Sequence, residues 1–330
     1  MASSVLVGLQ HGDEGKGKVA HWMLKNGDYT LCIRFNGGPN AGHKVYLTPE
    51  TPIVLHQVPT GILIPNIQCI IGPECVVDPI KLSNEIQYLS NAGIPNVKER
   101  LYISTQTHVI TPENIAEDIQ SNKVGTTASG IGPTYAKKAY RTGVCYKNYD
   151  SPNKIQQCDM YEILRQNQGE ILWEGAQGFE LDTDWGDYPY VTSSHCITGG
   201  AVNSGAQVRE IQRIVGAAKV YDTYLGTKQL QTDGDQVLTL IQEAGKEWGN
   251  TTGRKRQVQY LNLDKLEKAS WINGCTELVM SKCDILEQVN IFRLIHHQQL
   301  HEFSTLNEFK QYIETVFHGL KIYWSGSPIL

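Results

Sequence analysis

Short apolar runs alternate with longer amphipathic stretches along this chain. Short runs of apolar and β-branched residues are typical of buried strands, and apolar positions that recur every three to four residues indicate helices. The predicted strands span residues 4–7, 29–35, 101–104, 170–173, 213–220, 277–281 and 320–324. The predicted helices span residues 16–25, 79–91, 202–210, 235–245, 263–271 and 306–318. This alternation predicts an α/β fold, in which crossover helices join the strands of a mostly parallel central sheet.

Length and composition narrow the class of protein. The 330 residues are 40% hydrophobic and 19% charged, which is typical of folded rather than disordered chains. Neither a repeat nor a low-complexity linker divides the sequence, so residues 1–330 are predicted to form a single domain. A formal charge of −5 argues against nucleic acid as a partner. Because no run approaches the ~20 apolar residues of a bilayer span, we expect a cytoplasmic protein without a membrane partner.

The cysteines are scattered without the close pairs that bind zinc. They are Cys32, Cys69, Cys75, Cys145, Cys158, Cys196, Cys275 and Cys283. We expect reduced, mostly buried thiols, with neither a disulfide nor a metal role.

Several loops between the predicted elements are rich in glycine, threonine and proline. They span residues 8–18, 36–43, 124–133, 174–178 and 249–256. Binding and catalytic residues concentrate in such loops, so these segments are the first candidates for a functional site.

The first of these loops has the composition of a phosphate-binding loop. Residues 8–19 read Gly-Leu-Gln-His-Gly-Asp-Glu-Gly-Lys-Gly-Lys-Val and lead from a predicted strand into a predicted helix. Glycines let backbone N–H groups surround phosphate oxygens, and the lysines add positive charge. Gly12 and Gly17 have the standard spacing, but Val19 replaces the usual magnesium-binding hydroxyl.

The alternative interpretation of this first loop is an ordinary turn with solvated lysines. Asp13 argues against it, because a carboxylate among phosphate-binding amides needs a metal ion or a proton.

The second glycine-rich loop carries His43 after the second predicted strand. A lone histidine is usually structural, but loops that follow parallel strands meet at one edge of the sheet. His43 is therefore expected near the first loop, where an imidazole could donate to a phosphoryl group in transfer.

These two loops and further motifs resemble, in the same order, the adenylosuccinate synthetase family. The further motifs are Gly125-Thr126-Thr127, Gly130-Ile131-Gly132-Pro133, Trp173-Glu174-Gly175-Ala176-Gln177-Gly178, Tyr188-Pro189-Tyr190-Val191-Thr192-Ser193-Ser194 and Thr251-Thr252-Gly253-Arg254-Lys255-Arg256. The resemblance runs from residue 5 to residue 328. It implies a ligase of AMP biosynthesis that converts IMP, L-aspartate and GTP to adenylosuccinate, GDP and phosphate.

The resemblance also implies catalytic roles. Asp13 is similar to the general base that removes the N1 proton of IMP and also binds Mg²⁺, one ion per subunit, with the Gly42 carbonyl as a second metal contact. His43 is similar to the acid that stabilises charge at O6 and at the phosphoryl group. Loss of the N1 proton makes O6 a nucleophile, and the resulting 6-phosphoryl-IMP carries a leaving group that the aspartate amine displaces.

Binding residues follow from the same resemblance. Those for GTP are Gly12, Glu14, Gly15, Lys16, Gly17, Lys18, Gly42, Arg256, Lys282, Cys283, Asp284, Ser325, Gly326 and Ser327. Those for IMP are Asp13, Lys16, Asn40, Thr127, Arg141, Gln177, Thr192 and Arg254. Those for aspartate are Asn250, Thr251, Thr252, Gly253 and Arg254.

Two of these residues extend the hypothesis. Arg141 resembles the arginine that reaches the IMP phosphate of the neighbouring subunit, which implies a homodimer. Asp284 can accept hydrogen bonds from both N1–H and the 2-amino group of guanine, which predicts GTP as the donor. An exposed carboxylate in an ordinary ion pair is the alternative for Asp284.

The chain departs from the family pattern in two places and leaves two other functions open. Ser129 stands where an arginine often helps to hold aspartate, and Lys228, Gln229 and Gln231 replace a Gly/Pro-rich segment on the ribose side. A phage branch that uses dGMP to make 2-amino-2′-deoxyadenylosuccinate is therefore an alternative, although the presence of Asp13 favours IMP. A guanine-nucleotide switch is another, but the sequence has no Asp-x-x-Gly.

Overall fold

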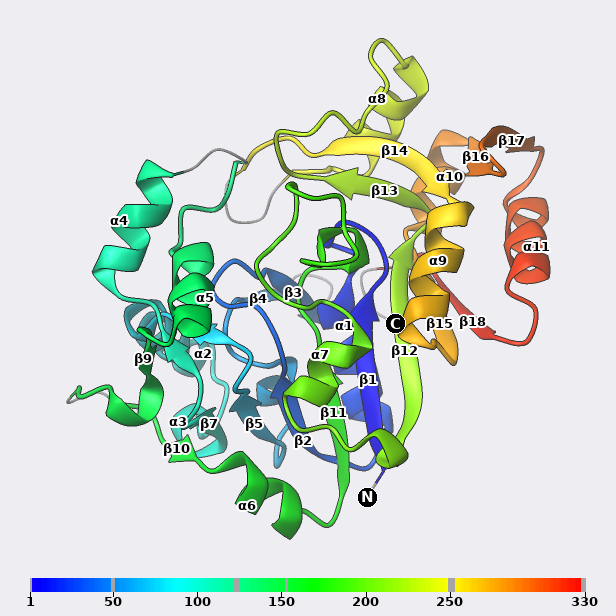
Figure 1. Ribbon diagram of the computed structural model, residues 1–330. Coiled ribbons are helices and arrows are strands. Elements are labelled where there is room, and N and C mark those ends of the chain that lie inside the picture. The colour runs from blue at the N-terminus through cyan, green and yellow to red at the C-terminus, as the bar shows by residue number, and fades with distance from the viewer. Residues whose placement is uncertain (1, 49–50, 122–124, 152–153, 249–252, 328–330) are drawn as a thin grey trace.

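A nine-stranded sheet forms the centre of the computed structural model (Figure 1), which describes all residues except 1, 49–50, 122–124, 152–153, 249–252 and 328–330. Across the sheet the strands are β10 (Gln157–Cys158), β7 (Leu101–Ser104), β5 (Gln68–Ile71), β2 (Tyr29–Arg34), β11 (Glu170–Glu174), β1 (Ser3–Gly8), β12 (Ile211–Lys219), β15 (Glu277–Ser281) and β18 (Lys321–Ser325). Every neighbouring pair is parallel. The predicted fold class is confirmed.

Smaller sheets surround the central one. A four-stranded sheet has the order β13 (Tyr221–Tyr224), β14 (Gln257–Asn262), β16 (Phe292–His296) and β17 (Gln299–Phe303). A hairpin pairs β3 (His43–Thr48) with β4 (Thr51–Leu55), and a third sheet joins β6 (Val76–Val77), β8 (His108–Val109) and β9 (Val144–Cys145). In Figure 1, β13 and β14 cross the top of the view, above the central strands.

Helices connect the strands, and many begin where the sequence offers a cap. They are α1 (Lys16–Asn26), α2 (Pro79–Asn91), α3 (Val97–Arg100), α4 (Pro112–Gln120), α5 (Ile131–Tyr140), α6 (Met160–Gln166), α7 (Thr198–Asn203), α8 (Gln236–Ala244), α9 (Leu263–Asn273), α10 (Cys283–Val289) and α11 (Leu306–Val316). Asp78 caps α2 through the N–H groups of Ile80 and Lys81, and Pro79 occupies the first turn, where no N–H is needed. Within the described residues, no helix is long and apolar enough to cross a membrane.

Successive side chains of the central strands enter two separate cores, one on each face of the sheet. In β1, Val5 and Val7 belong to a cluster that includes Leu266 of α9, whereas Leu6 belongs to a cluster that includes Met23 of α1. Burying a large apolar side chain stabilises the fold by roughly 1.5–3 kcal/mol. The sheet is thus held rigidly from both sides, which fixes the positions of the loops that leave its strands.

The prediction of a helix at residues 202–210 is wrong. The structure instead has α7 up to Asn203 and a short 3-10 turn at Val208–Glu210. Gly205 lies between them with a φ of 111°, a conformation that no helix contains. The short strands β5 and β10 were also not predicted.

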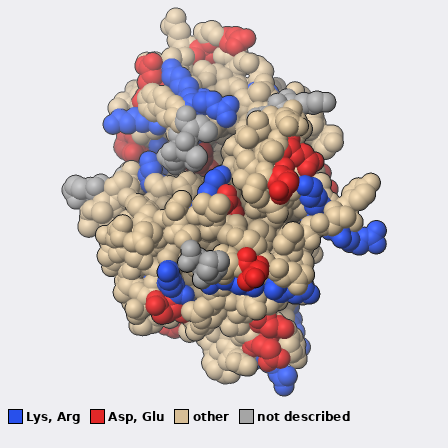
Figure 2. Space-filling view, turned by 90° about the vertical axis from the view of Figure 1, so that its left-hand side faces the viewer, with Lys and Arg blue, Asp and Glu red and all other residues tan. Residues whose placement is uncertain are grey.

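Charged side chains of both signs are scattered over the face shown in Figure 2, which is the left-hand side of Figure 1 and carries α4 and α5. Among the described residues of this face, blue and red side chains alternate with uncharged ones. This surface is therefore electrostatically mixed rather than dominated by one sign of charge.

Candidate functional site

A large cavity opens at the edge of the sheet where the central strands end. Its volume is about 780 Å³, and the loops after five strands contribute to its wall. Asp13 follows β1, Asn40 follows β2, Gln177 follows β11, Lys219 ends β12 and Lys282 follows β15. Ligands of parallel α/β sheets bind in such crevices outside the carboxyl ends of the strands, so this cavity is the candidate active site.

Most of the predicted site residues lie in the wall of this one cavity. Those that line it are Gly12, Asp13, Glu14, Gly15, Lys16, Gly17, Lys18, Asn40, Gly42, His43, Thr127, Gln177, Thr192, Arg256, Lys282, Asp284 and Ser327. The described residues that lie outside this lining are Arg141, Gly253, Arg254, Cys283, Ser325 and Gly326. Asn250, Thr251 and Thr252 lie outside the described residues. Segments hundreds of residues apart thus meet in one cavity wall.

The first loop closes around the carboxylate of its own Glu14. This fully buried carboxylate accepts hydrogen bonds from the backbone N–H groups of Gln10 (3.1 Å) and Gly12 (2.9 Å). Lys16 Nζ donates to its other oxygen at 2.6 Å. Gly12 and Gly15 have φ values of 85° and 88°, which a side chain would resist. Glu14 therefore shapes the loop and positions Lys16, which lies in the cavity wall.

Lys18, in the first turn of α1, contacts the end of β18 and the residues after it. Its Nζ donates to Ser325 Oγ at 2.7 Å and to the Ser327 carbonyl at 2.9 Å. Burial lowers the pKa of Lys18 to about 8, although the Asp284 carboxylate opposes this shift. The predicted GTP-binding residues of the first loop, of β18 and of the start of α10 are therefore neighbours.

On one side of the cavity, ion pairs between side chains of distant loops satisfy the charged groups. Asp13 Oδ2 lies 2.8 Å from Arg256 Nε, and Arg256 Nη1 donates to Glu247 Oε2, also at 2.8 Å. Glu247 Oε1 accepts from the Tyr221 hydroxyl at 2.7 Å and lies 3.5 Å from Lys282 Nζ. We call Asp13, Glu247, Arg256 and Lys282 the arginine wall.

Charges nearby keep Glu247 ionised although it is buried. Burial alone would raise its pKa, but Lys219, Lys282 and Arg256 outweigh burial and lower the pKa to about 2. Lys219 is itself buried, which lowers its pKa, and its Nζ donates to Thr223 Oγ1. The arginine wall therefore carries full charges of both signs inside the cavity.

Elsewhere in the lining of the cavity, His43 lies against the buried carboxylate of Glu174. His43 Nδ1 lies 2.6 Å from Glu174 Oε1, and Arg34 Nη2 donates to the same oxygen at 3.0 Å. Thr60 binds Glu174 twice, through its backbone N–H at 2.7 Å and its hydroxyl at 2.8 Å. We call Arg34, His43, Thr60 and Glu174 the histidine wall.

The electrostatics of the histidine wall follow from this packing. Burial, followed by the Arg34 charge, lowers the pKa of His43 to about 4, although Glu174 opposes the shift. Burial would raise the pKa of Glu174, but Arg34 and His43 outweigh it and hold that pKa well below its usual range. The free protein therefore holds a neutral imidazole whose Nδ1–H donates to a carboxylate, which fixes its orientation.

Gln177 is the cavity side chain whose state most directly indicates a ligand. Both its amide oxygen and its amide nitrogen are buried, and neither has a hydrogen-bond partner among the described residues. Its backbone also has a φ of 57°, an unusual conformation for a residue other than glycine. Leaving a buried amide unpaired costs about 1–3 kcal/mol per group, so this side chain is prepared for a polar molecule.

Sequence reasoning did not assign Glu174 or Glu247. Glu174 belongs to one of the motifs that resemble the family and directly follows a predicted strand. Its position beside a glycine-rich turn could therefore have indicated a buried carboxylate in the site. Glu247 had no comparable signal, because its partners Tyr221, Arg256 and Lys282 lie in other segments of the chain.

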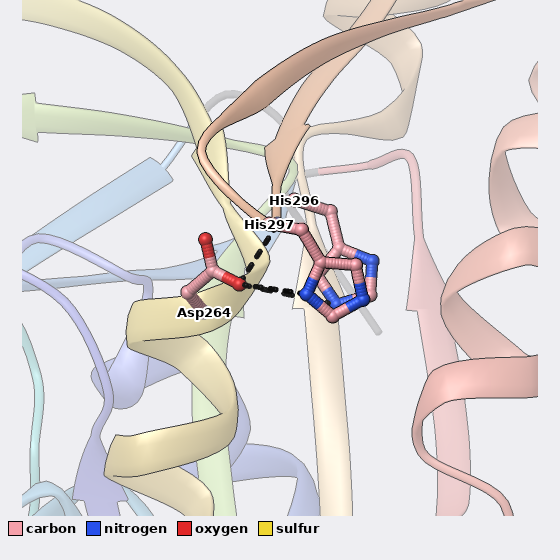
Figure 3. Close-up of side chains that lie close together, drawn as sticks. All are labelled: Asp264, His296 and His297. Atoms are coloured by element: carbon pink, nitrogen blue, oxygen red, sulfur yellow. Dashed lines mark hydrogen bonds and ion pairs between the residues drawn. The ribbon is translucent and has the colours of Figure 1, made fainter.

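A second cluster of polar side chains lies where α9 begins beside the β16–β17 hairpin (Figure 3). Asp264 accepts from the backbone N–H groups of His297 (2.9 Å) and Gln298 (3.2 Å), and its Oδ1 lies 3.8 Å from His297 Nδ1. His296 Nδ1 lies 2.9 Å from the Tyr312 hydroxyl. These contacts fasten the hairpin turn to the helices beside it, which gives the cluster a structural role.

Comparison with known proteins shows the family that this chain resembles. A model of the family described as adenylosuccinate synthetase matches residues 5–158 and 146–323. The adenylosuccinate synthetase of Thermodesulfovibrio yellowstonii is 38% identical over 88% of this chain and 79% of its own length. That of Chlorobium chlorochromatii is 33% identical over 97% of this chain and 86% of its own length.

Solved structures share the fold. The fully ligated adenylosuccinate synthetase of Plasmodium falciparum superposes with a TM-score of 0.87 at 24% identity, over 99% of this chain and 97% of that one. The succinoaminodeoxyadenylate synthetase of cyanophage S-2L, bound to dGMP and to dATP as an energy donor, has a TM-score of 0.80 at 21% identity, over 99% and 93%. Because the family model and the curated relatives match most of the chain, the chain belongs to the adenylosuccinate synthetase family.

Proposed function

We propose that this chain joins L-aspartate to IMP at the expense of GTP, giving adenylosuccinate, GDP and phosphate. Membership of the family supports the reaction type. The observation that carries the assignment is the convergence of Asp13, His43 and the unpartnered Gln177 amide on one cavity beside the phosphate-binding loop. These groups provide a base, an acid and a purine contact in one place.

Asp13 acts as the general base. Its carboxylate takes the N1 proton of IMP, O6 attacks the γ-phosphorus of GTP, and the bond to GDP breaks. The aspartate amine then attacks C6 of 6-phosphoryl-IMP, phosphate leaves from that carbon, and the amine loses a proton. In the free protein Asp13 is paired with Arg256, so Arg256 must shift toward the incoming phosphates before Asp13 can act.

His43 stabilises the charge that develops at O6 and at the phosphoryl group. Its Nδ1–H is held by Glu174, so Nε2 is the nitrogen left for the substrate. The approaching phosphoryl charge favours a proton on Nε2, and Glu174 then stabilises the imidazolium from behind, as an oriented carboxylate does for a catalytic histidine. His43 can therefore donate to O6 without any movement of the ring.

Mg²⁺ suits the oxygen groups beside the phosphate loop. The Asp13 carboxylate and Gly42 both lie in the cavity wall, and a carboxylate with a backbone carbonyl is the hard donor set that Mg²⁺ prefers. The ion would neutralise phosphate charge, with Asp13 and Gly42 as its protein ligands.

GTP is the proposed phosphoryl donor. Lys16, Lys18 and the backbone of the first loop would hold its phosphates, and Asp284 lies in the cavity wall where it could accept from guanine. The remaining predicted contacts come from Lys282, Cys283 and residues 325–327, which adjoin Asp284 and Lys18.

L-aspartate and a second subunit complete the proposal. Arg254 is exposed close to the predicted aspartate loop, where its guanidinium can bind a carboxylate. Arg141 caps the end of α5 with an exposed side chain outside its own cavity, which supports a role in the site of a partner subunit. The active unit is then a homodimer in which each cavity borrows one arginine.

The alternative acceptor is dGMP. The fold shared with the cyanophage synthetase bound to dGMP favours keeping this alternative.

A substrate panel tests the proposal. The enzyme is incubated with aspartate, with GTP or ATP, and with IMP, dIMP, GMP or dGMP, and the product is read by mass. We expect adenylosuccinate from IMP and GTP as the fastest product. Faster turnover of dGMP would establish the alternative, and GTP hydrolysis without IMP and aspartate would instead indicate a nucleotide switch.

A further inference from the structure

Asp118 joins the two ends of the loop at residues 126–130, which carries Thr127 in the wall of the cavity. Asp118 lies near the end of α4, is only 5% exposed and itself lines the cavity. Its Oδ1 accepts a hydrogen bond from the Thr126 hydroxyl at 3.0 Å, and its Oδ2 accepts from the Gly130 backbone N–H at 2.8 Å. A single carboxylate thus holds the loop on both sides of Thr127.

The loop needs such support because its backbone is sharply bent. Ala128 has a φ of 50° and Gly130 a φ of 75°, and the first of these is an unusual conformation for a residue with a side chain. The Thr126 hydroxyl, which donates to Asp118, also accepts from the Ala128 N–H at 3.2 Å. Because a backbone N–H only donates, the Gly130 contact requires an acceptor at position 118. Loss of the Asp118 carboxylate would therefore release the bend around Thr127.

The helix that carries Asp118 is itself fastened to α5. One helical turn before Asp118, the buried Asn114 donates from Nδ2 to Thr134 Oγ1 at 2.8 Å. Lys137 Nζ donates in turn to Asn114 Oδ1 at 2.6 Å. These contacts join α4 to α5 independently of the loop, so Asp118 is a fixed point to which the loop is attached.

The loop held by Asp118 lies beside a second segment with a predicted nucleotide contact. Thr127 and Thr192 both line the cavity, and both are predicted to bind IMP. Their segments are neighbours, since a Cβ built on Gly132 would lie 3.4 Å from Ser193 Oγ. Displacement of the loop would therefore move Thr127 relative to Thr192, and one nucleotide could no longer contact both hydroxyls in the same geometry.

We infer that Asp118 is a positioning residue, which holds Thr127 where the purine monophosphate binds. The inference rests on the proposed function, because that function assigns this nucleotide to Thr127. In this role Asp118 acts through the loop rather than on the reacting atoms. Its removal should weaken binding of the monophosphate and leave the phosphoryl donor and the chemical step unaffected. A substitution that raises KM at unchanged kcat has that signature.

The test compares the Asp118→Ala variant with the wild type. KM for IMP, KM for GTP and kcat are measured, and binding of IMP and of dGMP is measured by calorimetry without GTP or aspartate. We expect KM and Kd for IMP to rise about tenfold, the scale of one buried hydrogen bond. KM for GTP and kcat should stay within about twofold of the wild type.

Two further variants separate positioning from a general loss of structure. Asp118→Asn keeps one oxygen, which can accept from one of the two donors, so its KM for IMP should lie between those of the wild type and Asp118→Ala. Asp235→Ala is the matched control, because Asp235 accepts from two backbone N–H groups at the start of α8 and lies outside the cavity lining. It should lower the free energy of unfolding without changing KM for IMP. Asp118→Asn carries the test if Asp118→Ala does not fold.

Unchanged binding of IMP by the folded Asp118 variants, or an equal rise of KM for IMP and for GTP, would overturn the inference. A wild type that binds neither IMP nor dGMP would overturn it as well. Failure of the proposed function would look different: the wild type would bind a monophosphate without converting it, and calorimetry would still compare the Asp118 variants with the wild type.

Discussion

The two walls of the cavity hold their charged groups in different ways. In the histidine wall, Glu174 accepts from Thr60, Arg34 and His43, and it is fully buried in the core of the protein. In the arginine wall, Asp13 is held by Arg256, a cation from a loop far along the chain.

This difference indicates which part of the site is rigid and which part rearranges. In the histidine wall, the Glu174 carboxylate has its hydrogen-bond partners without a substrate, which is the preorganised arrangement that stabilises a transition state. In the arginine wall, Asp13 and Glu247 are paired with Arg256, a cation that we propose binds the phosphates. If this cation binds the phosphates as proposed, we expect substrate binding to exchange partners there, a shift between two states of the same ion pairs.

The Glu174→Gln substitution disrupts the histidine wall and should have the largest effect on stability and on kcat. It leaves the buried Arg34 charge without its partner, so the free energy of unfolding should fall by about 3–5 kcal/mol in urea denaturation. Because His43 loses the carboxylate that orients it, kcat of the folded variant should fall at least ~10²-fold. Glu277→Gln is the matched control, since Glu277 pairs with Arg213 outside the cavity lining. An equal loss of kcat in both variants would contradict the role of Glu174.

Acid unfolding tests the arginine wall. The pKa of Glu247 is lowered from 4.5 to about 2, so its contribution is present above pH 4.5 and lost as the pH falls toward 2. That contribution is roughly 3 kcal/mol. Glu247→Gln should flatten this part of the stability curve, measured by urea unfolding from pH 7 to pH 2, whereas Glu302→Gln, an exposed control, should not. A wild-type curve unchanged through this range would show that the wall is not held by Glu247.

The Arg141→Leu substitution tests whether the active site needs an arginine from a second subunit in addition to its two walls. Loss of one bidentate phosphate contact should weaken IMP binding by about 1.5–3 kcal/mol. Mixing this variant with Asp13→Ala chains should restore activity, because one cavity of a mixed dimer then has both residues. Recovery should reach at most half of the wild-type value. No recovery despite proven subunit exchange would place Arg141 in its own chain or outside the site.

Asp284→Asn should have the smallest effect. The substituted amide presents a donor toward the donors of guanine, so kcat/KM for GTP relative to ATP should fall about tenfold. A wild-type preference for ATP would already contradict guanine recognition by Asp284.

The sequence predicted those parts of the molecule that are determined by residues close together in the chain. The long strands and the loops after them follow from apolar runs bounded by glycines, as at Gly12 and Gly15, and a parallel sheet necessarily brings such loops together. The prediction of a helix at residues 202–210 failed because the pattern of apolar residues could not reveal the positive φ of Gly205. The pairing of His11 with Asp222 was not foreseeable, because only the folded chain brings the two together.

The most direct test of the account is turnover of IMP by Asp13→Ala, since proton removal at N1 is the step on which the reaction depends. Adenylosuccinate formation from IMP, GTP and aspartate is followed by mass, with Asp187→Ala as a control at a carboxylate that pairs with Lys228. The account predicts at least a ~10²-fold loss of kcat for Asp13→Ala and near-normal kcat for the control. Near-normal turnover by folded Asp13→Ala would contradict it.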